Sequence, residues 1–178
     1  MIIGIHGKAG SGKDTIGQMI IESDPESNWH RKAFADKIKV ISAEILALDP
    51  KLVFSDSFKQ VEIPRLQMTG RDFLQKFGTD MCRKHLSEDI WLNALLDEYS
   101  PDKNWVITDV RFRNEANRIK ELGGKLIKVT RDTDELSHIS ERDLETYHFW
   151  DQVIDNNSTI DDLRTIVEND TCKLFTST

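Results

Sequence analysis

The chain shows two kinds of apolar pattern: short runs typical of buried strands, and longer stretches in which apolar residues recur at helical spacing. Ile2, Ile3 and Ile5 form a β-branched run that ends in a glycine-rich loop, and helical spacing follows over residues 16–20. A second apolar segment at residues 33–35 precedes a helical pattern over residues 38–46. The first 46 residues therefore predict a strand, a loop and a helix, followed by a second apolar segment and a second helix.

The middle of the chain predicts helices interrupted by a looser excursion. Pro50, Pro64 and the polar stretch between them follow neither the helical nor the strand period. Helical spacing resumes over residues 73–81 and 91–99, and Pro101 closes the second of these runs.

The last third of the chain predicts strands separated by helices. Asp109 ends the first of these strands, and Gly123-Gly124 ends the helix that follows it, because glycine accepts left-handed dihedral angles. The strands are expected at residues 104–109, 125–130 and 152–156, with helices over 112–122 and from Thr159 onward. Strands that alternate with helices in this way predict a doubly wound α/β sheet.

Composition narrows the class of protein. The 178 residues suit one domain with a single core, and the net charge of -7, from 24 basic and 31 acidic residues, disfavours a nucleic-acid polymer as partner. A small anion held in a local basic pocket remains compatible with that charge. The sequence contains neither a signal peptide nor a membrane span, so we expect a cytoplasmic protein. Cys82 and Cys172 are far apart in sequence and indicate neither a disulfide framework nor a zinc site.

The stretch GIHGKAGSGKDT, residues 4–15, predicts a phosphate-binding loop. A glycine-rich turn between a strand and a helix exposes backbone N–H groups beside the positive end of the helix dipole. Lys13 would reach the β and γ phosphates of a nucleoside triphosphate. The alternative is a glycine-rich surface turn. The residues predicted to bind ATP here are Gly7, Lys8, Ala9, Gly10, Ser11, Gly12, Lys13, Asp14 and Thr15.

Asp14 departs from the usual pattern of such loops, in which Ser or Thr follows the lysine. The usual hydroxyl contacts magnesium, and a carboxylate is also a hard oxygen ligand for Mg²⁺ or for its waters. Thr15 could bond an α-phosphate oxygen instead. The substitution therefore predicts a changed mode of holding metal and nucleotide rather than a loss of binding.

From Met1 to about Val167 the chain resembles the bacteriophage deoxynucleoside monophosphate kinases, and three motifs carry this resemblance. The loop ends Gly-Lys-Asp-Thr, as in that family, and a Leu-Gln-x-x-Gly-Thr-Asp run at residues 74–80 is followed by Trp91. The third motif is Asp-x-Arg-x-x-x-Glu, formed by Asp109, Arg111 and Glu115. Enzymes of this family carry the γ-phosphoryl group of ATP to a deoxynucleoside 5'-monophosphate.

The resemblance implies a fold and a division of the chain. It implies a three-layer α/β/α kinase domain of the phosphate-loop type, with a mostly parallel five-stranded sheet and a small lid. The domain would span residues 1–170, with a helical acceptor-binding part at about 36–100, a lid at about 131–148 and a C-terminal tail at 171–178. Small nucleotides would be the partners, and a homodimer is compatible with the family.

Phosphoryl transfer between two nucleotides requires converging cations, because several negative charges must meet. Asp109, at the carboxyl end of a strand, would hold magnesium through water together with Asp14. Arg111 would lie near the acceptor phosphate, although an ion pair with Glu115 is the alternative. Arg71 would clamp a phosphate with its planar fork, although alone it could be an ordinary solvated arginine. The residues expected to carry catalysis are Lys13, Arg71, Asp109, Arg111 and Arg131.

The resemblance also implies an acceptor site. Gly78, inside a helix where glycine costs about 1 kcal/mol relative to alanine, suggests close approach of a ligand. Trp91 could flank the base, although core packing explains most of the neighbouring apolar residues. Family members often have Gly-Pro where this chain has Asp36-Lys37. The full predicted set is Ala35, Asp36, Lys39, Arg71, Gly78, Thr79, Asp80, Trp91, Asp109, Arg111, Glu115 and Glu141.

The polar segment after residue 130 predicts the lid. Arg131, and with it Arg142, would close over the phosphates and exclude water. His138 and Glu141 fit the family pattern, and a metal role for His138 lacks a second histidine at ligand spacing. Asn156 and Asn157 could face the adenine, although an asparagine turn explains them nearly as well.

Two other functions remain open from the residues alone. One is a related small-molecule kinase, such as one acting on dephospho-coenzyme A. The other is a switch or motor that only hydrolyses ATP, against which the acidic charge and small size count.

Overall fold

The computed structural model describes residues 1–132 and 143–176. It divides into two compact units, one formed by Met1–Ala33 and Tyr99–Thr178 and the other by Phe34–Glu98. The second unit spans nearly the same residues as the helical part expected from the sequence. We describe each unit by itself and call them the sheet unit and the helical unit.

The sheet unit contains five parallel strands in the order β2-β5-β1-β6-β7. This arrangement confirms the predicted mostly parallel five-stranded sheet. The strands are β1 (Ile2–Gly7), β2 (Trp29–Lys32), β5 (Asn104–Ile107), β6 (Lys125–Thr130) and β7 (Gln152–Asp155).

The position of β2 differs from the apolar segment that the sequence indicated. The strand is Trp29–Lys32, and of its four residues only Trp29 is buried. Ala33 and Phe34 are buried as well, but Phe34 already begins α2 (Phe34–Leu46). β2 is an edge strand that pairs with β5 alone, which explains why charged residues are tolerated in it.

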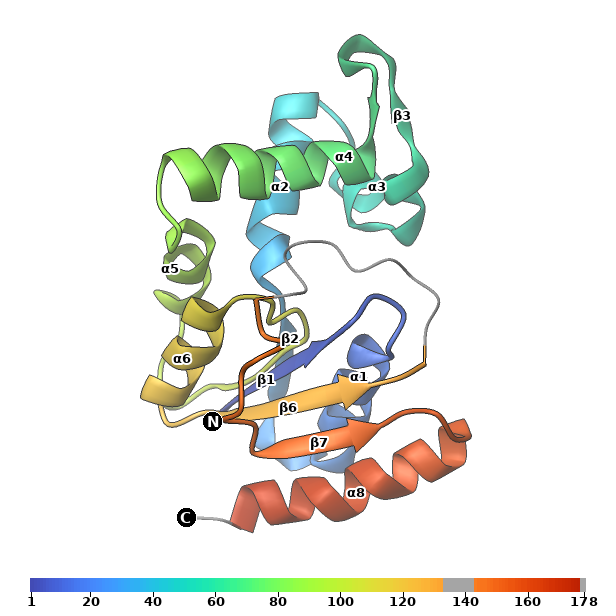
Figure 1. Ribbon diagram of the computed structural model, residues 1–178, viewed down its shortest axis with the longest axis vertical. Helices are drawn as coiled ribbons and strands as arrows, with labels where there is room; N and C mark the ends of the chain where they lie inside the picture. Colours follow the sequence, from blue (N-terminus) through green and yellow to red (C-terminus); the bar gives the residue numbers. More distant parts are fainter. Residues whose placement is uncertain (133–142, 177–178) are drawn as a thin grey trace. The chain divides into compact units, whose positions relative to one another are not determined.

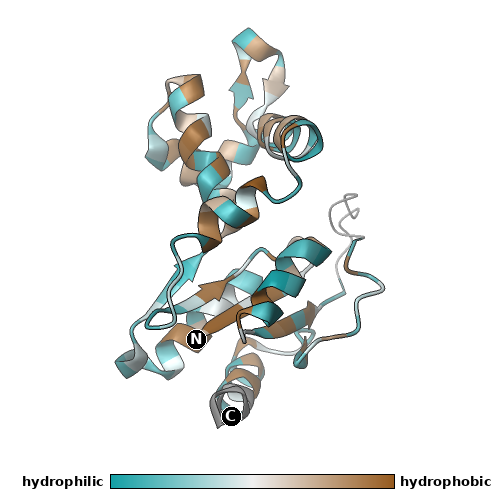
Figure 2. Ribbon diagram, turned by 90° about the vertical axis from the view of Figure 1, so that its left-hand side faces the viewer, coloured by the Kyte–Doolittle hydropathy of each residue, from teal (hydrophilic) through white to brown (hydrophobic). Residues whose placement is uncertain are grey.

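Helices cover both faces of the sheet, as Figure 1 shows. On one face α1 (Lys13–Ser23) and α8 (Ile160–Thr176) pack side by side and share a hydrophobic core with the strands. On the other face α6 (Arg113–Glu121) approaches β1 closely, because an ideal Cβ at Gly4 would lie 2.7 Å from Cδ1 of Ile119. In Figure 2 strands in the middle of the sheet are largely brown, whereas the helices alternate brown and teal along their length. The predicted three-layer α/β/α architecture is confirmed.

The C-terminal helix is longer than the sequence suggested. A tail was expected from residue 171, but α8 continues to Thr176. Neither glycine nor proline occurs between Ile160 and Thr176, so the sequence holds no residue that would end the helix earlier.

The helical unit has its own hydrophobic core. Its core residues are Ala43, Leu46, Val53, Phe58 and Ile63. After α2 it contains α3 (Pro50–Phe54), an antiparallel pair β3 (Glu62–Ile63) and β4 (Met68–Thr69), α4 (Gly70–Gln75), a π-helix (Lys76–Arg83) and α5 (Ile90–Leu96). Short 3₁₀ turns at Asp56–Gln60 and Pro64–Leu66 occupy the rest of the stretch predicted as a loose excursion.

Outside the two gaps at 133–142 and 177–178, no helix is both long and apolar enough to cross a membrane.

Candidate active site

The loop between β1 and α1 has the geometry of an anion site. Gly12 precedes α1 with φ 93° and ψ 18°, in the left-handed region that favours glycine. The first helical hydrogen bond runs from Ile16 N to Gly12 O at 2.9 Å, so the N-terminal amides of this 11-residue helix lie at its positive end, where an anion binds favourably.

Asn156 fixes the loop from beneath. Its Nδ2 donates to Ser11 O at 2.8 Å, its backbone N donates to Thr130 O at 2.8 Å, and the residue is 7% exposed. A Cβ at Gly12 would lie 2.4 Å from Asn156 Nδ2, so the position of Asn156 requires glycine at residue 12. The structure thus gives Asn156 a role in shaping the loop, and a contact with adenine stays a prediction.

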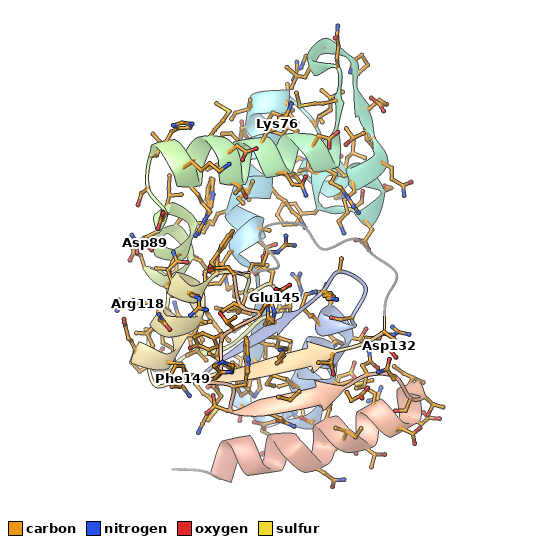
Figure 3. The ribbon with its side chains drawn as sticks, in the orientation of Figure 1. Lys76, Asp89, Arg118, Asp132, Glu145 and Phe149 are labelled. Carbon is orange, nitrogen blue, oxygen red and sulfur yellow. The ribbon has the colours of Figure 1, made fainter. Side chains whose placement is uncertain are left out.

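Asn157 also has a structural contact, because its Oδ1 accepts a 2.9 Å hydrogen bond from Asp132 N. Asp132 is labelled in Figure 3 beyond the end of β6.

Two of the predicted cationic residues contact the loop. Lys13 Nζ donates to Lys8 O at 2.7 Å, and Arg131 NH1 lies 3.4 Å from Gly10 O. Arg131 directly follows β6, which neighbours β1. Both cations are therefore placed where the phosphates of a bound nucleotide would meet the loop.

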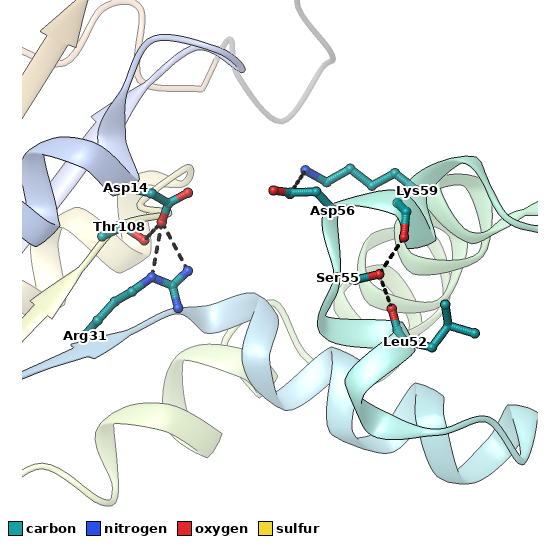
Figure 4. A network of polar contacts seen from close by, with 8 residues as sticks. Asp14, Arg31, Leu52, Ser55, Asp56, Lys59 and Thr108 are labelled. Atoms are coloured by element: carbon teal, nitrogen blue, oxygen red, sulfur yellow. Dashed lines mark hydrogen bonds and ion pairs between the residues drawn. The ribbon is translucent and has the colours of Figure 1, made fainter. Parts of the chain in front are cut away.

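Asp14 is held by two residues that the sequence did not single out (Figure 4). Arg31 Nε and NH2 donate to Asp14 Oδ1 at 3.2 and 3.1 Å, and Thr108 Oγ1 donates to the same oxygen at 2.6 Å. Partial burial acts to raise the pKa of Asp14, but the Thr108 hydrogen bond and the Arg31 charge outweigh it and lower the pKa below its usual value. Asp14 is therefore a carboxylate at neutral pH.

The sequence did not predict Arg31 as a site residue, because it lies in a short polar edge strand without a recognisable motif. The signal that could have found it is the unusual loop itself. An extra negative charge among phosphate-binding amides calls for a nearby cation.

The segment after β5 carries Asp109 and Arg111 and is tied down at both ends. Thr108 N donates to Lys32 O at 3.2 Å and Val110 N donates to Ile5 O at 3.1 Å. Asp109 therefore follows β5 at the carboxyl edge of the sheet, the same edge at which the phosphate loop leaves β1.

Glu115 orients this segment through the backbone. Its Oε2 accepts hydrogen bonds from Arg111 N at 2.7 Å and from Phe112 N at 3.0 Å, and the residue is 3% exposed. The bonds that the structure shows between Arg111 and Glu115 are thus to the main chain, rather than the side-chain ion pair considered above. A contact between Glu115 and the acceptor stays a prediction.

His6, the residue before the loop, supports the same segment. Its Nδ1 lies 2.9 Å from Val110 O and therefore carries the proton, because a carbonyl oxygen accepts. The ring stacks on Trp150 at 5.2 Å between centroids. β1 and the segment that carries Asp109 are consequently joined by a buried side chain.

The described part of the predicted lid is anchored to α6. Arg113 N donates to Asp143 Oδ2 at 2.7 Å, and the Arg113 guanidinium donates to Asp143 O and to Thr146 Oγ1. The predicted site residue Glu141, together with His138 and Arg142, lies outside the described residues.

The helical unit contains the other predicted acceptor residues. Ala35, Asp36 and Lys39 lie on α2, and Lys39 Nζ lies 5.2 Å from the ring of Phe54. Arg71 lies exposed in the first turn of α4, which Thr69 and Asp72 cap reciprocally.

A π-helix contains Gly78, Thr79 and Asp80. Single π turns inside α-helices occur often at functional sites. Trp91 is 4% exposed, and its Nε1 donates to Gly78 O at 2.8 Å. A Cβ at Gly78 would lie 2.7 Å from Cδ1 of Ile38, so within this unit the close approach that Gly78 permits is that of α2.

Taken alone, the sheet unit can bind a polyphosphate. It offers helix-terminal amides and two cations, and at the same sheet edge it carries the carboxylates of Asp14 and Asp109. Mg²⁺ in phosphoryl-transfer sites is commonly held by one or two carboxylates together with substrate phosphates, and these residues fit that donor set. Among the described residues, nothing donates to Asp14 Oδ2, so this oxygen is open to such a cation.

Comparison with known proteins identifies a family and two relatives that match most of the chain. The deoxynucleotide monophosphate kinase family model matches residues 52–167. A putative deoxynucleotide monophosphate kinase of Acanthamoeba polyphaga mimivirus is 33% identical over 181 residues, covering 91% of each chain. The deoxynucleoside-5'-monophosphate kinase of Escherichia phage T5 is 26% identical, over 68% of this chain and 72% of its own.

Solved structures share the fold. A dephospho-CoA kinase from Campylobacter jejuni matches with a TM-score of 0.52 and 17% identity, covering 97% of this chain and 96% of its own. A gluconokinase from Sinorhizobium meliloti matches with a TM-score of 0.52 and 13% identity, over 99% of this chain and 97% of its own. At these identities the likeness concerns the fold alone.

Proposed function

Because the chain belongs to the deoxynucleotide monophosphate kinase family, we propose that it transfers the γ-phosphoryl group of ATP to a deoxynucleoside 5'-monophosphate. The products are ADP and the deoxynucleoside diphosphate. The single observation that carries this assignment beyond family membership is the phosphate loop contacted by Lys13 and Arg131 at the carboxyl edge of the sheet. The names of the mimivirus and phage T5 relatives support the choice of acceptor.

The donor side of the reaction belongs to the loop. Its amides and the α1 terminus bind the phosphates of ATP, while Lys13 and Arg131 neutralise charge as the terminal group is transferred. An oxygen of the acceptor monophosphate attacks the γ-phosphorus, and the bond from that phosphorus to the bridging oxygen of ADP breaks. Monoester oxygens are nucleophilic at neutral pH, so this step requires positioning and charge neutralisation rather than an obligatory general base.

Magnesium is the proposed cofactor. When bound, it neutralises negative charge on the phosphates and holds them in position. Asp14 and Asp109 are the residues that would hold it, directly or through water. The support for this choice is the open Oδ2 of Asp14 and the place of Asp109 at the same edge of the sheet.

The acceptor side is proposed from the resemblance. Arg71 would clamp the acceptor phosphate, and Arg111 would lie near the transferring group. Asp36, Lys39 and the π-helix residues would contact the rest of the monophosphate. We also propose a location in the cytoplasm, of a host cell if the chain is viral, and a homodimer, both on the resemblance alone.

The decisive experiment is a steady-state panel of the common deoxy- and ribonucleoside monophosphates with ATP and Mg²⁺, with ADP formation as the readout. We expect turnover with at least one deoxynucleoside monophosphate and none with dephospho-coenzyme A. ATP hydrolysis that is stimulated by DNA polymer and not by any monophosphate would replace the kinase assignment with a motor or switch.

Two variants test the residue roles. Lys13→Ala should lower kcat by orders of magnitude with an unchanged circular dichroism spectrum, whereas Lys59→Ala, which removes an exposed ion pair with Asp56, should leave kcat unaltered. Arg71→Ala should chiefly raise the KM of the monophosphate. A raised KM for ATP alone would contradict the placement of Arg71.

A further inference from the structure

We propose that Arg31 is a positioning residue that compensates the charge of Asp14 and so makes an aspartate workable where phosphate loops ordinarily carry Ser or Thr. The proposal rests on the proposed function, because it concerns how the loop accepts the triphosphate. It assigns a role to a residue that neither the loop motif nor the family match, which begins at residue 52, includes.

The contacts are concentrated on one atom. Arg31 Nε, Arg31 NH2 and Thr108 Oγ1 all donate to Asp14 Oδ1, at 3.2, 3.1 and 2.6 Å. Three donors on one oxygen fix the carboxylate and leave Oδ2 without a donor among the described residues. Figure 4 shows this second oxygen without any dashed line.

The donors come from the sheet and not from the helix that carries Asp14. Arg31 lies on β2, paired with Val106 of β5, and Thr108 follows β5 directly. The orientation of Asp14 is therefore set by two neighbouring strands. A hydroxyl at this position would need no such support, because it is neutral and can rotate to suit its partner.

Charge supplies the second part of the argument. A carboxylate at the start of α1 adds one negative charge beside a ligand that carries several, and like charges at short range oppose binding. Arg31 offsets the charge of this carboxylate while Oδ2 keeps its capacity as a hard oxygen donor for a divalent cation. The Asp14–Arg31 pair would thus replace a neutral hydroxyl by a charge-compensated carboxylate that still offers an anionic ligand atom.

The competing explanation is an ordinary surface ion pair. The side chains of Arg31 and Asp14 are 41% and 71% exposed, and exposed pairs contribute little to stability. That explanation predicts that removal of Arg31 affects nucleotide binding equally whether or not Asp14 is present. The two explanations therefore differ in the coupling between the residues.

The test is a double-mutant cycle of wild type, R31Q, D14S and the combined variant, with the Kd of ATP measured by calorimetry in Mg²⁺ and in EDTA. We expect R31Q to raise the Kd of ATP at least tenfold in EDTA. The increase should be smaller in Mg²⁺, because the cation partly substitutes for the lost guanidinium charge. In the D14S background the same substitution should change the Kd less than about twofold in either buffer. R118Q, which removes an exposed ion pair with Glu121 of the same 3.1 Å length, is the control and should leave the Kd unchanged.

The proposal would be overturned if R31Q raised the Kd of ATP equally in both backgrounds, or by no more than R118Q does. If R31Q does not fold, R31M in the same two backgrounds gives the same comparison, because it also removes the charge of Arg31 and both of its hydrogen bonds to Asp14. The measurement needs no acceptor, so it remains decisive if the wild type binds ATP but phosphorylates no monophosphate, an outcome that would refute only the proposed function.

Discussion

Replacement of Asn156 by alanine tests whether the asparagine acts through the loop or through the base. The substitution removes the 2.8 Å hydrogen bond to Ser11 O from a residue that is 7% exposed. A buried carbonyl that loses its donor costs about 1–3 kcal/mol. For a chain of this length each kcal/mol corresponds to roughly 2–4 °C, so the Tm should fall by about 2–12 °C.

The effect on ligands should be independent of the base. Because the loop binds phosphates, N156A should raise the Kd of ATP, GTP and inorganic tripolyphosphate by similar factors, measured by calorimetry. N157A, which loses an exposed contact with Asp132 N, is the matched control and should change stability by no more than about 0.5 kcal/mol. An unchanged Tm with a loss of affinity for ATP alone would refute the reasoning and support a contact with adenine.

Three further predictions concern the helical unit. Trp91→Phe removes the donor to Gly78 O and should lower the free energy of unfolding in urea by about 1–3 kcal/mol, and a value near zero would show that the carbonyl finds another partner. Gly78→Ala should lower the free energy of unfolding through overpacking. Ile38→Val removes the Cδ1 atom that lies 2.7 Å from the new Cβ, so it should restore part of the loss, and additive effects of the two substitutions would contradict this close contact. The hydroxyl of Thr69 lowers the pKa of Asp72, so the stability that the ionised capping box adds should be full well above pH 4 and be lost as the pH falls through the lowered pKa. Thr69→Ala should reduce this loss, because only the hydrogen bond from the backbone N of residue 69 remains, and a Tm-against-pH series should show a flatter acid limb.

The sheet and its loop could be predicted because their signals are local. Ile2, Ile3 and Ile5 before the glycines indicate a buried strand. The apolar run before Asp109 likewise predicts a strand, although β5 ends at Ile107, two residues earlier than expected. β2 could not be predicted in the same way. An edge strand of four residues with one buried side chain shows too little periodicity to be recognised as a strand. The position of Arg31 at the sheet edge could not be predicted for the same reason.

Contacts between distant parts of the chain account for the remaining differences. Gly78 was expected to admit a ligand, but in its own unit it admits Ile38, forty residues earlier. Asn156 meets Ser11 across 145 positions, and no short motif encodes such a pairing. The sequence singled out both Gly78 and Asn156, whereas the identity of their neighbours depends on tertiary packing.

The phosphate loop also satisfies its own carbonyl oxygens from within the chain. Lys8 O accepts from Lys13, Gly10 O faces Arg131, and Ser11 O accepts from Asn156. Each of these three carbonyl oxygens therefore has a donor from elsewhere in the chain. A phosphate that drew Lys13 or Arg131 toward itself would take a donor from Lys8 O or Gly10 O, so the shape of the loop is coupled to the cations that balance the charge of its ligand.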